Sequence, residues 1–132
     1  MKQRTLTSPF TLHGKGLHTG KVAKMTVCPA AENTGIVFVR TDIGPDAVVK
    51  ALAENVSTTT RSTTISQNGA SVSTIEHILS ALTGMGVDNA LIEIDNVEVP
   101  ILDGSAKPYI DAIWADGFVQ QNEPRKYIEI KE

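Results

Sequence analysis

Residues 73–82 read Ser-Thr-Ile-Glu-His-Ile-Leu-Ser-Ala-Leu, and they predict the helix around which the rest of the chain is arranged. Apolar side chains recur in and just after this stretch at spacings of three and four residues, which places them on one face of a helix. These side chains are Ile75, Ile78, Leu79, Leu82 and Met85. We therefore expect an amphipathic helix whose apolar face packs on a sheet.

Both ends of this helix carry sequence signals. Ser73 and Glu76 match a capping box, in which each of the two side chains accepts a hydrogen bond from the backbone N–H of the other residue. Gly84 or Gly86 is expected to end the helix, because glycine commonly follows the last helical turn.

The segments before the helix predict strands and turns. Residues 57–66 are rich in β-branched threonine, which favours a strand, and Asn68-Gly69 is a hairpin turn signal. A glycine-rich turn is expected at residues 13–20. Further strands are expected at residues 3–12 (an edge strand, because it contains Pro9), 21–28, 36–40 and 47–50.

The segments after the helix predict an apolar strand at residues 90–95, an extended stretch at 98–101 and a second helix at 106–115. Ser105 is the expected N-cap of this second helix, and Gly117 is expected to stop it. Its apolar face is expected to contain Ile110, Ile113 and Trp114. The alternating pattern of residues 125–131 predicts a last strand with no turn after it, so we expect the natural chain to continue.

Together these elements predict an α+β fold, with one mostly antiparallel sheet and both helices packed on one face. The length of 132 residues fits a single domain over residues 1–132. Hydrophobic residues make up 41% and charged residues 20%, which is typical of a soluble globular domain.

Composition also excludes several classes of partner. The net charge of -3 argues against nucleic acid, because phosphate binding requires a basic surface. No apolar run approaches the roughly 20 residues that span a bilayer, and no apolar segment follows the basic N-terminus. We therefore expect neither a membrane span nor a signal peptide. The single cysteine, Cys28, indicates a reducing cytoplasmic setting.

Glu76 and His77 are the first candidates for chemistry. A histidine can hold a metal, and a neighbouring glutamate can serve as general base to a metal-activated water. The alternative is that Glu76 completes the capping box and that His77 is an ordinary hydrogen-bonded or solvated side chain. Spacing leaves both readings open, since Ala81 stands where an HExxH motif would place its second histidine.

Two other polar segments could form part of a site. His13 and His18 lie in a glycine-rich segment that either approaches a ligand or forms a mobile turn. The Ser/Thr run around Arg61 is either a polar wall for a sugar or diphosphate or a strand facing solvent.

Six segments, taken in order, resemble the UDP-3-O-acyl-N-acetylglucosamine deacetylases. They are residues 2–6 (Lys-Gln-Arg-Thr-Leu), 16–20 (Gly-Leu-His-Thr-Gly), 33–36 (Asn-Thr-Gly-Ile), 73–82, 86–89 (Gly-Val-Asp-Asn) and 98–106 (Glu-Val-Pro-Ile-Leu-Asp-Gly-Ser-Ala). Each segment alone is weak evidence for this family, but six segments in this order are specific evidence. The resemblance covers nearly the whole chain.

The resemblance implies a cytoplasmic zinc-dependent hydrolase that removes acetate from UDP-3-O-(3-hydroxyacyl)-N-acetylglucosamine in lipid A biosynthesis. It also implies two similar domains whose helices are sandwiched between two sheets, with the zinc ion between the domains. This chain then corresponds to the N-terminal domain only. Some relatives carry a fused dehydratase downstream.

Carried over by position, the resemblance makes His77 a zinc ligand and Glu76 the general base. It places Leu17 and His18 in a loop near the substrate, and Thr60, Arg61 and Ser62 in a segment bordering the site. The family's other two zinc ligands, and the lysine and histidine that assist the reaction, belong to the second domain. This chain alone is therefore expected to be inactive.

Three alternatives remain at the level of sequence. The chain could be a non-enzymatic module that binds a nucleotide sugar or a partner domain. It could be a self-contained metallohydrolase that uses His13, His18 and His77. It could also form a homodimer whose helices pack across the interface in place of a second domain.

Overall fold

The computed structural model describes residues 1–125 and confirms the predicted α+β class. The helices and strands, in chain order, are β1 (Lys2–Leu6), β2 (Phe10–Lys15), β3 (Val22–Pro29), β4 (Ile36–Arg40), β5 (Val48–Lys50), β6 (Val56–Thr58), β7 (Thr64–Gln67), β8 (Ala70–Ser73), α1 (Glu76–Gly84), β9 (Ala90–Ile94), α2 (Lys107–Asp116) and β10 (Phe118–Pro124). A short 3-10 helix, Ala53–Asn55, precedes β6.

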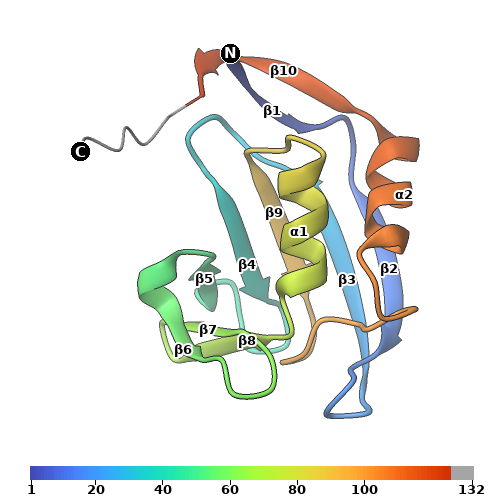
Figure 1. The fold of residues 1–132 in the computed structure, drawn as a ribbon. Coiled ribbons are helices and arrows are strands. Elements are labelled where there is room, and N and C mark those ends of the chain that lie inside the picture. The colour runs from blue at the N-terminus through green and yellow to red at the C-terminus, as the bar shows by residue number, and fades with distance from the viewer. Residues whose placement is uncertain (126–132) are drawn as a thin grey trace, which may run out of the picture.

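The central sheet has five strands in the order β2-β3-β9-β4-β5. All neighbouring pairs are antiparallel except β4 and β9, which run parallel. Two smaller antiparallel sheets flank it: the β1-β10 ribbon and the three-stranded β6-β7-β8 sheet. Figure 1 shows α1 lying across one face of the central sheet with α2 beside it, as expected for two helices on one face.

The core forms between this sheet face and the helices. Alternate residues of β3 (Ala23, Met25 and Val27) are fully buried, while Val22 and Lys24 are exposed. β9 alternates in the same way, which is the period of a strand that buries one face. These side chains join Phe38 and the apolar face of α1 in one continuous cluster.

The predicted apolar face of the first helix is confirmed. Ile75, Ile78 and Leu82 are buried, together with Ala81, and Leu79 and Met85 pack against the same cluster while partly exposed. The predicted capping box is wrong. Ser73 is the last residue of β8, the helix starts after Ile75, and no side chain caps its first turn.

The second helix lies one residue later than predicted, and its apolar face differs. Tyr109 and Ile113 are buried, since they stand one turn apart on the side that faces α1 and the core. Ile110 is 37% exposed and Trp114 is 73% exposed, so their assignment to the apolar face is wrong. Ser105 is not the N-cap: it donates to Asp103 and accepts from the N–H of Lys107 instead.

Two predicted strands are each divided in the structure. Residues 3–12 form β1 and β2, because the chain turns at Thr7–Pro9 and leaves the ribbon for the central sheet. Residues 57–66 form the ends of β6 and β7, joined by an exposed loop, so the threonine run is not one strand. The glycine-rich turn is shorter than predicted, because residues 13–15 belong to β2.

The remaining strands follow the prediction closely. β3, β4, β5 and β9 each lie within two residues of the expected bounds, and Asn68-Gly69 forms the β7–β8 hairpin with positive φ at both residues. Residues 98–101 make a single bridge to β8 instead of a strand. The sequence did not predict β10, and residues 126–131 of the expected last strand lie outside the described residues.

Over residues 1–125, neither helix is long and apolar enough to cross a membrane.

The end of α1 allows a matched pair of stability tests. Gly84 has ordinary helical φ and open space where a Cβ would stand, so Gly84→Ala should raise the free energy of unfolding by about 0.5–1 kcal/mol. Gly86 has φ +74 and a guanidinium nitrogen of Arg4 at 3.3 Å from that position, so Gly86→Ala should lower it by about 1–2 kcal/mol. Urea unfolding of both variants measures the difference. Equal losses of stability in the two variants would contradict the assigned end of the helix.

Candidate functional site

Four of the five residues expected near the substrate lie around one surface hollow of about 290 Å³. His18 comes from the β2–β3 hairpin loop, and Thr60, Arg61 and Ser62 come from the loop between β6 and β7. Thr58, Thr64 and Ser73, which were not predicted, complete the lining. Leu17 is 60% exposed in the same hairpin loop as His18 and does not line the hollow.

Glu76 and His77 lie in the first turn of α1, which begins three residues after Ser73 on the wall of the hollow. The carboxylate of Glu76 is exposed, and His77 is half-buried. A negative side chain in this position interacts favourably with the positive end of the helix dipole. The first turn of α1 therefore carries an exposed carboxylate and a half-buried imidazole, three and four residues after Ser73.

A buried carboxylate connects the hairpin loop to the start of α1. Glu98 is 1% exposed, and its oxygens accept hydrogen bonds from the backbone N–H groups of His18 (3.0 Å) and Thr19 (2.9 Å). They also accept a bond of 2.6 Å from the hydroxyl of Thr74, two residues before Glu76. Glu98 thus holds two separate segments of the site together.

Gly16 allows the loop to come this close. A Cβ built on Gly16 would lie 2.2 Å from Oε1 of Glu98 and 2.7 Å from the hydroxyl of Thr19. Any larger residue would push the carboxylate away from the N–H groups of the loop. Gly16, the first glycine of the Gly-Leu-His-Thr-Gly segment, is therefore required by close approach and not by a positive φ.

Sequence reasoning missed Glu98, although a signal was present. Glu98 stands between Val97 and Val99 in an otherwise apolar stretch, and a lone carboxylate in such a stretch is often buried and paired. Its burial opposes ionisation and raises its pKa, but the hydrogen bonds from Thr74, Thr19 and His18 outweigh that effect. The net pKa of Glu98 lies below its ordinary value.

The structure does not support the self-contained metal site. His13 is exposed on β2, His18 is in the hairpin loop and His77 is on α1. Within residues 1–125, no three His, Cys, Asp or Glu side chains converge to hold a metal ion. Of these three histidines, His18 lines the hollow, and His77 lies in the first turn of α1.

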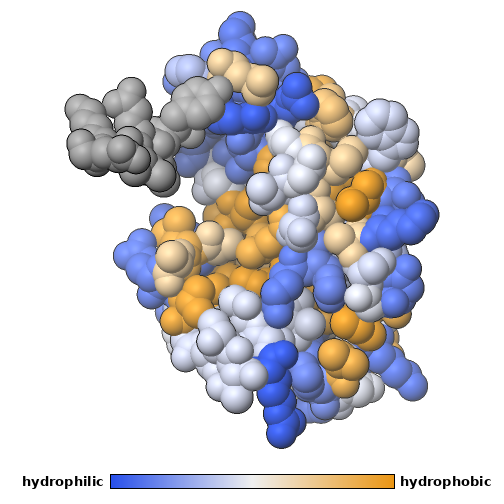
Figure 2. Space-filling view, viewed as in Figure 1, coloured by the Kyte–Doolittle hydropathy of each residue, from blue (hydrophilic) through white to orange (hydrophobic). Residues whose placement is uncertain are grey.

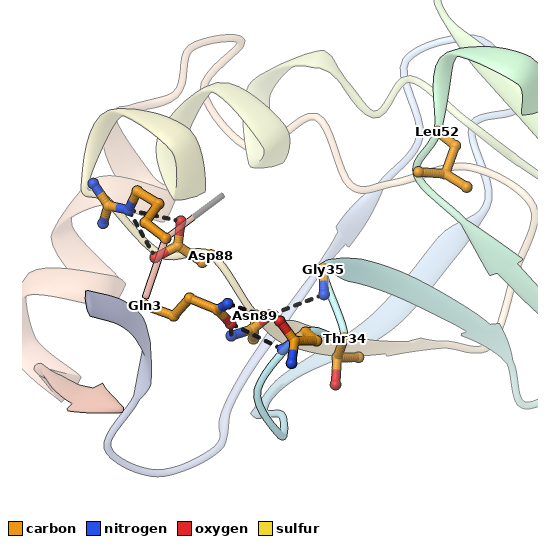
Figure 3. A pocket seen from close by; sticks show the side chains of 8 residues that line it. Gln3, Thr34, Gly35, Leu52, Asp88 and Asn89 are labelled. Carbon is orange, nitrogen blue, oxygen red and sulfur yellow. Dashed lines mark hydrogen bonds and ion pairs between the residues drawn. The ribbon is translucent and has the colours of Figure 1, made fainter. Parts of the chain in front are cut away.

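A second pocket, also of about 290 Å³, lies at the other end of α1, and it has a structural role. Figure 3 shows Gln3 and Asn89 pointing toward each other beside Gly35. The Asn89 amide donates to Oε1 of Gln3 at 2.9 Å and to Gln121 at 2.7 Å, and Asn89 accepts from the N–H of Gly35. These hydrogen bonds join β1 and β10 to Asn89, the residue that precedes β9.

The acid stability of the protein should depend on Glu98. At neutral pH, Glu98→Gln should lower the free energy of unfolding by about 2–3 kcal/mol, because an amide with one acceptor oxygen replaces a carboxylate that binds three donors. In the native protein the pKa of Glu98 is below its ordinary value, so its contribution is complete above about pH 4.3 and is lost as the pH falls through the native pKa.

Urea unfolding between about pH 3 and pH 7 measures this effect, and Glu98→Gln should show a weaker dependence on acid than the wild type. Glu93→Gln is the matched control, because that carboxylate is exposed on β9. Wild-type stability and wild-type acid dependence in Glu98→Gln would show that the buried carboxylate contributes nothing.

Sequence comparison relates the chain to known proteins. Residues 3–132 match the family described as LpxC: UDP-3-O-acyl N-acetylglycosamine deacetylase. The UDP-3-O-acyl-N-acetylglucosamine deacetylase of Saccharophagus degradans is 50% identical over 131 residues, which cover 99% of this chain and 43% of that protein. The enzyme of the same name from Nitrosococcus oceani is 47% identical with the same coverage.

A longer relative is similar over the same region. The bifunctional enzyme LpxC/FabZ of Porphyromonas gingivalis is 50% identical over 130 residues, which cover 98% of this chain and 28% of that protein. The chain therefore spans less than half the length of these curated relatives. Because the family match includes nearly every residue, the chain belongs to the LpxC family of UDP-3-O-acyl N-acetylglycosamine deacetylases.

Proposed function

We propose that this chain is the N-terminal domain of a zinc-dependent deacetylase that removes acetate from UDP-3-O-(3-hydroxyacyl)-N-acetylglucosamine in lipid A biosynthesis. Its membership of the LpxC family and the names of its relatives support the reaction. The structural support is one observation: the hollow lined by His18, Thr60, Arg61 and Ser62 extends to Ser73, which lies three residues before Glu76 at the start of α1.

His77 is the proposed zinc ligand of this domain. Its half-buried imidazole is fixed by a helix and not by a loop, which suits a metal ligand. Catalytic zinc sites usually have three protein ligands, so we assign the other two to a second domain. A zinc ion bound there would lower the pKa of a coordinated water and polarise the substrate carbonyl.

Glu76 is the proposed general base. It is exposed beside His77 in the same helical turn, so it can accept a proton from the water that attacks the acetamide carbonyl. In this way the chain contributes one metal ligand and one base to a site that it does not complete alone.

The hollow is the proposed binding surface for the nucleotide sugar. Thr60 and Ser62 contribute hydroxyl groups, and Arg61 contributes a guanidinium that can bind a diphosphate or sugar oxygen. His18 also lines the hollow, and exposed Leu17 offers apolar contact beside it.

We propose that the second domain covers the face that carries the helices, as one half of a two-domain sandwich. Figure 2 shows an apolar area beside α1, toward the part of the molecule formed by β5 to β8. Trp114 of α2 is also strongly exposed, and apolar surface of this kind is typical of an interface. A cytoplasmic location is proposed with it, supported by the unpaired thiol of Cys28.

Substitutions in the full-length protein test these roles. Glu76→Gln should lower the rate of acetate release from the UDP-sugar by roughly 100- to 10,000-fold, because the proton acceptor is lost while the side-chain shape is kept. Its zinc content should not change. His77→Ala should lower both zinc content and acetate release, because a metal ligand is removed. Elemental mass spectrometry measures the zinc content, and an acetate assay measures the rate of acetate release.

His13→Ala and Glu93→Gln serve as controls, since both side chains are exposed and lie outside the hollow. The chain of 132 residues alone should release little or no acetate, because it has one of the expected zinc ligands. A zinc-loaded full-length protein that releases no acetate would refute the proposed reaction. Full activity of Glu76→Gln would refute the role of Glu76.

A further inference from the structure

Three segments of the candidate site meet at two buried residues, Thr74 and Glu98. The backbone N–H of Thr74 donates to the carbonyl of Thr63, at the end of the loop that carries Arg61, at 2.9 Å. Its hydroxyl donates to Glu98, which in turn accepts from the N–H groups of the hairpin loop. Thr74 itself directly precedes Ile75 and α1.

These contacts fix the segments relative to one another. The hairpin loop is held through Glu98, the β6–β7 loop through Thr63, and the first turn of α1 through the backbone of Thr74. Thr74 is 5% exposed and Glu98 is 1% exposed, so neither side chain reaches the surface of the hollow. Their effect on a ligand must therefore pass through the residues that they hold.

The backbone of Thr74 adds a second observation. Its φ is +60, a left-handed conformation that is unfavourable for a β-branched residue. Such a conformation persists only where the surrounding contacts determine it, and it often occurs at functional sites. The bonds to Thr63 and Glu98 are contacts of this kind, and the conformation turns the chain from β8 into α1.

We propose that Thr74 and Glu98 form a positioning pair that sets both substrate-contacting loops against Glu76 and His77. This inference rests on the proposed deacetylase function. Small displacements of reacting groups are costly, since about 1 Å can reduce a rate by roughly 100-fold. The pair therefore affects both substrate binding, through the loops, and the chemical step, through α1.

Two substitutions at Thr74 test the hydroxyl in the full-length protein. Thr74→Val keeps the shape and the branched Cβ but cannot donate to Glu98, and it should reduce kcat/KM by roughly 10- to 100-fold. KM should rise and kcat should fall, because loops and helix both move. Thr74→Ser keeps the hydroxyl and should stay within roughly threefold of the wild type. Thr83→Val, an exposed threonine of α1, is the matched control.

Amide hydrogen exchange separates a positioning role from a general loss of stability. In Thr74→Val, the amides of His18 and Thr19 should exchange about tenfold faster or more, while the amides between β3 and β9 keep wild-type protection. If Thr74→Val does not fold, Thr74→Gly tests the same hydroxyl, because glycine adopts a positive φ without strain. It should show the same loss of kcat/KM.

The outcomes of these experiments distinguish a positioning role of Thr74 and Glu98 from a general role in stability. Wild-type kcat and KM in a folded Thr74→Val protein would overturn the proposal. Faster exchange across the whole sheet would also overturn it, because the residue would then support the fold in general. If the wild-type protein releases no acetate, the proposed function fails, and the exchange rates of His18 and Thr19 still decide whether the pair holds the loop.

Discussion

Glu98 has its carboxylate surrounded by donors from two other segments, and the arrangement of the site follows from this interaction. An unpaired carboxylate at this depth would be strongly unfavourable, so the backbone N–H groups of His18 and Thr19 are required to stabilise it. The close approach of Gly16 makes those contacts sterically accessible. The hairpin loop is therefore held against the start of α1, although it is otherwise an exposed turn.

The segments that resemble the deacetylases divide between the two ends of α1. Residues 2–6, 33–36 and 86–89 meet in the polar network of Gln3 and Asn89, which joins the outer ribbon to the central sheet. Residues 16–20, 73–82 and 98–106 meet at Glu98 and the first turn of the helix. One group of segments thus stabilises the fold, and the other builds the candidate site.

Periodicity predicted the elements well where one face alone is buried, as in β3, β9 and α1. Local sequence signals failed where tertiary contacts determine the structure. The hydroxyl of Ser73 lies near the carbonyl of Val97 instead of capping a helix. Trp114 is exposed because Tyr109 and Ile113 occupy the inner side of α2. The proposed roles of Glu76 and His77 rest on family resemblance and not on periodicity. The lone carboxylate of Glu98 in an apolar stretch was a signal for burial, but its partners were not predictable, because two of its donors are backbone N–H groups about 80 residues away.

The ribbon of β1 and β10 has a consequence for synthesis of the chain. Thr5 pairs with Val119, so β1 lacks its ribbon partner until nearly all of the described residues have been translated. At ordinary elongation rates that delay is on the order of ten seconds. During this time the edge of β1 is an unpaired strand, a form prone to association with other chains. Once β10 is in place, the side chain of Gln3 in β1 bonds to Asn33, Asn89 and Pro124 of its own chain.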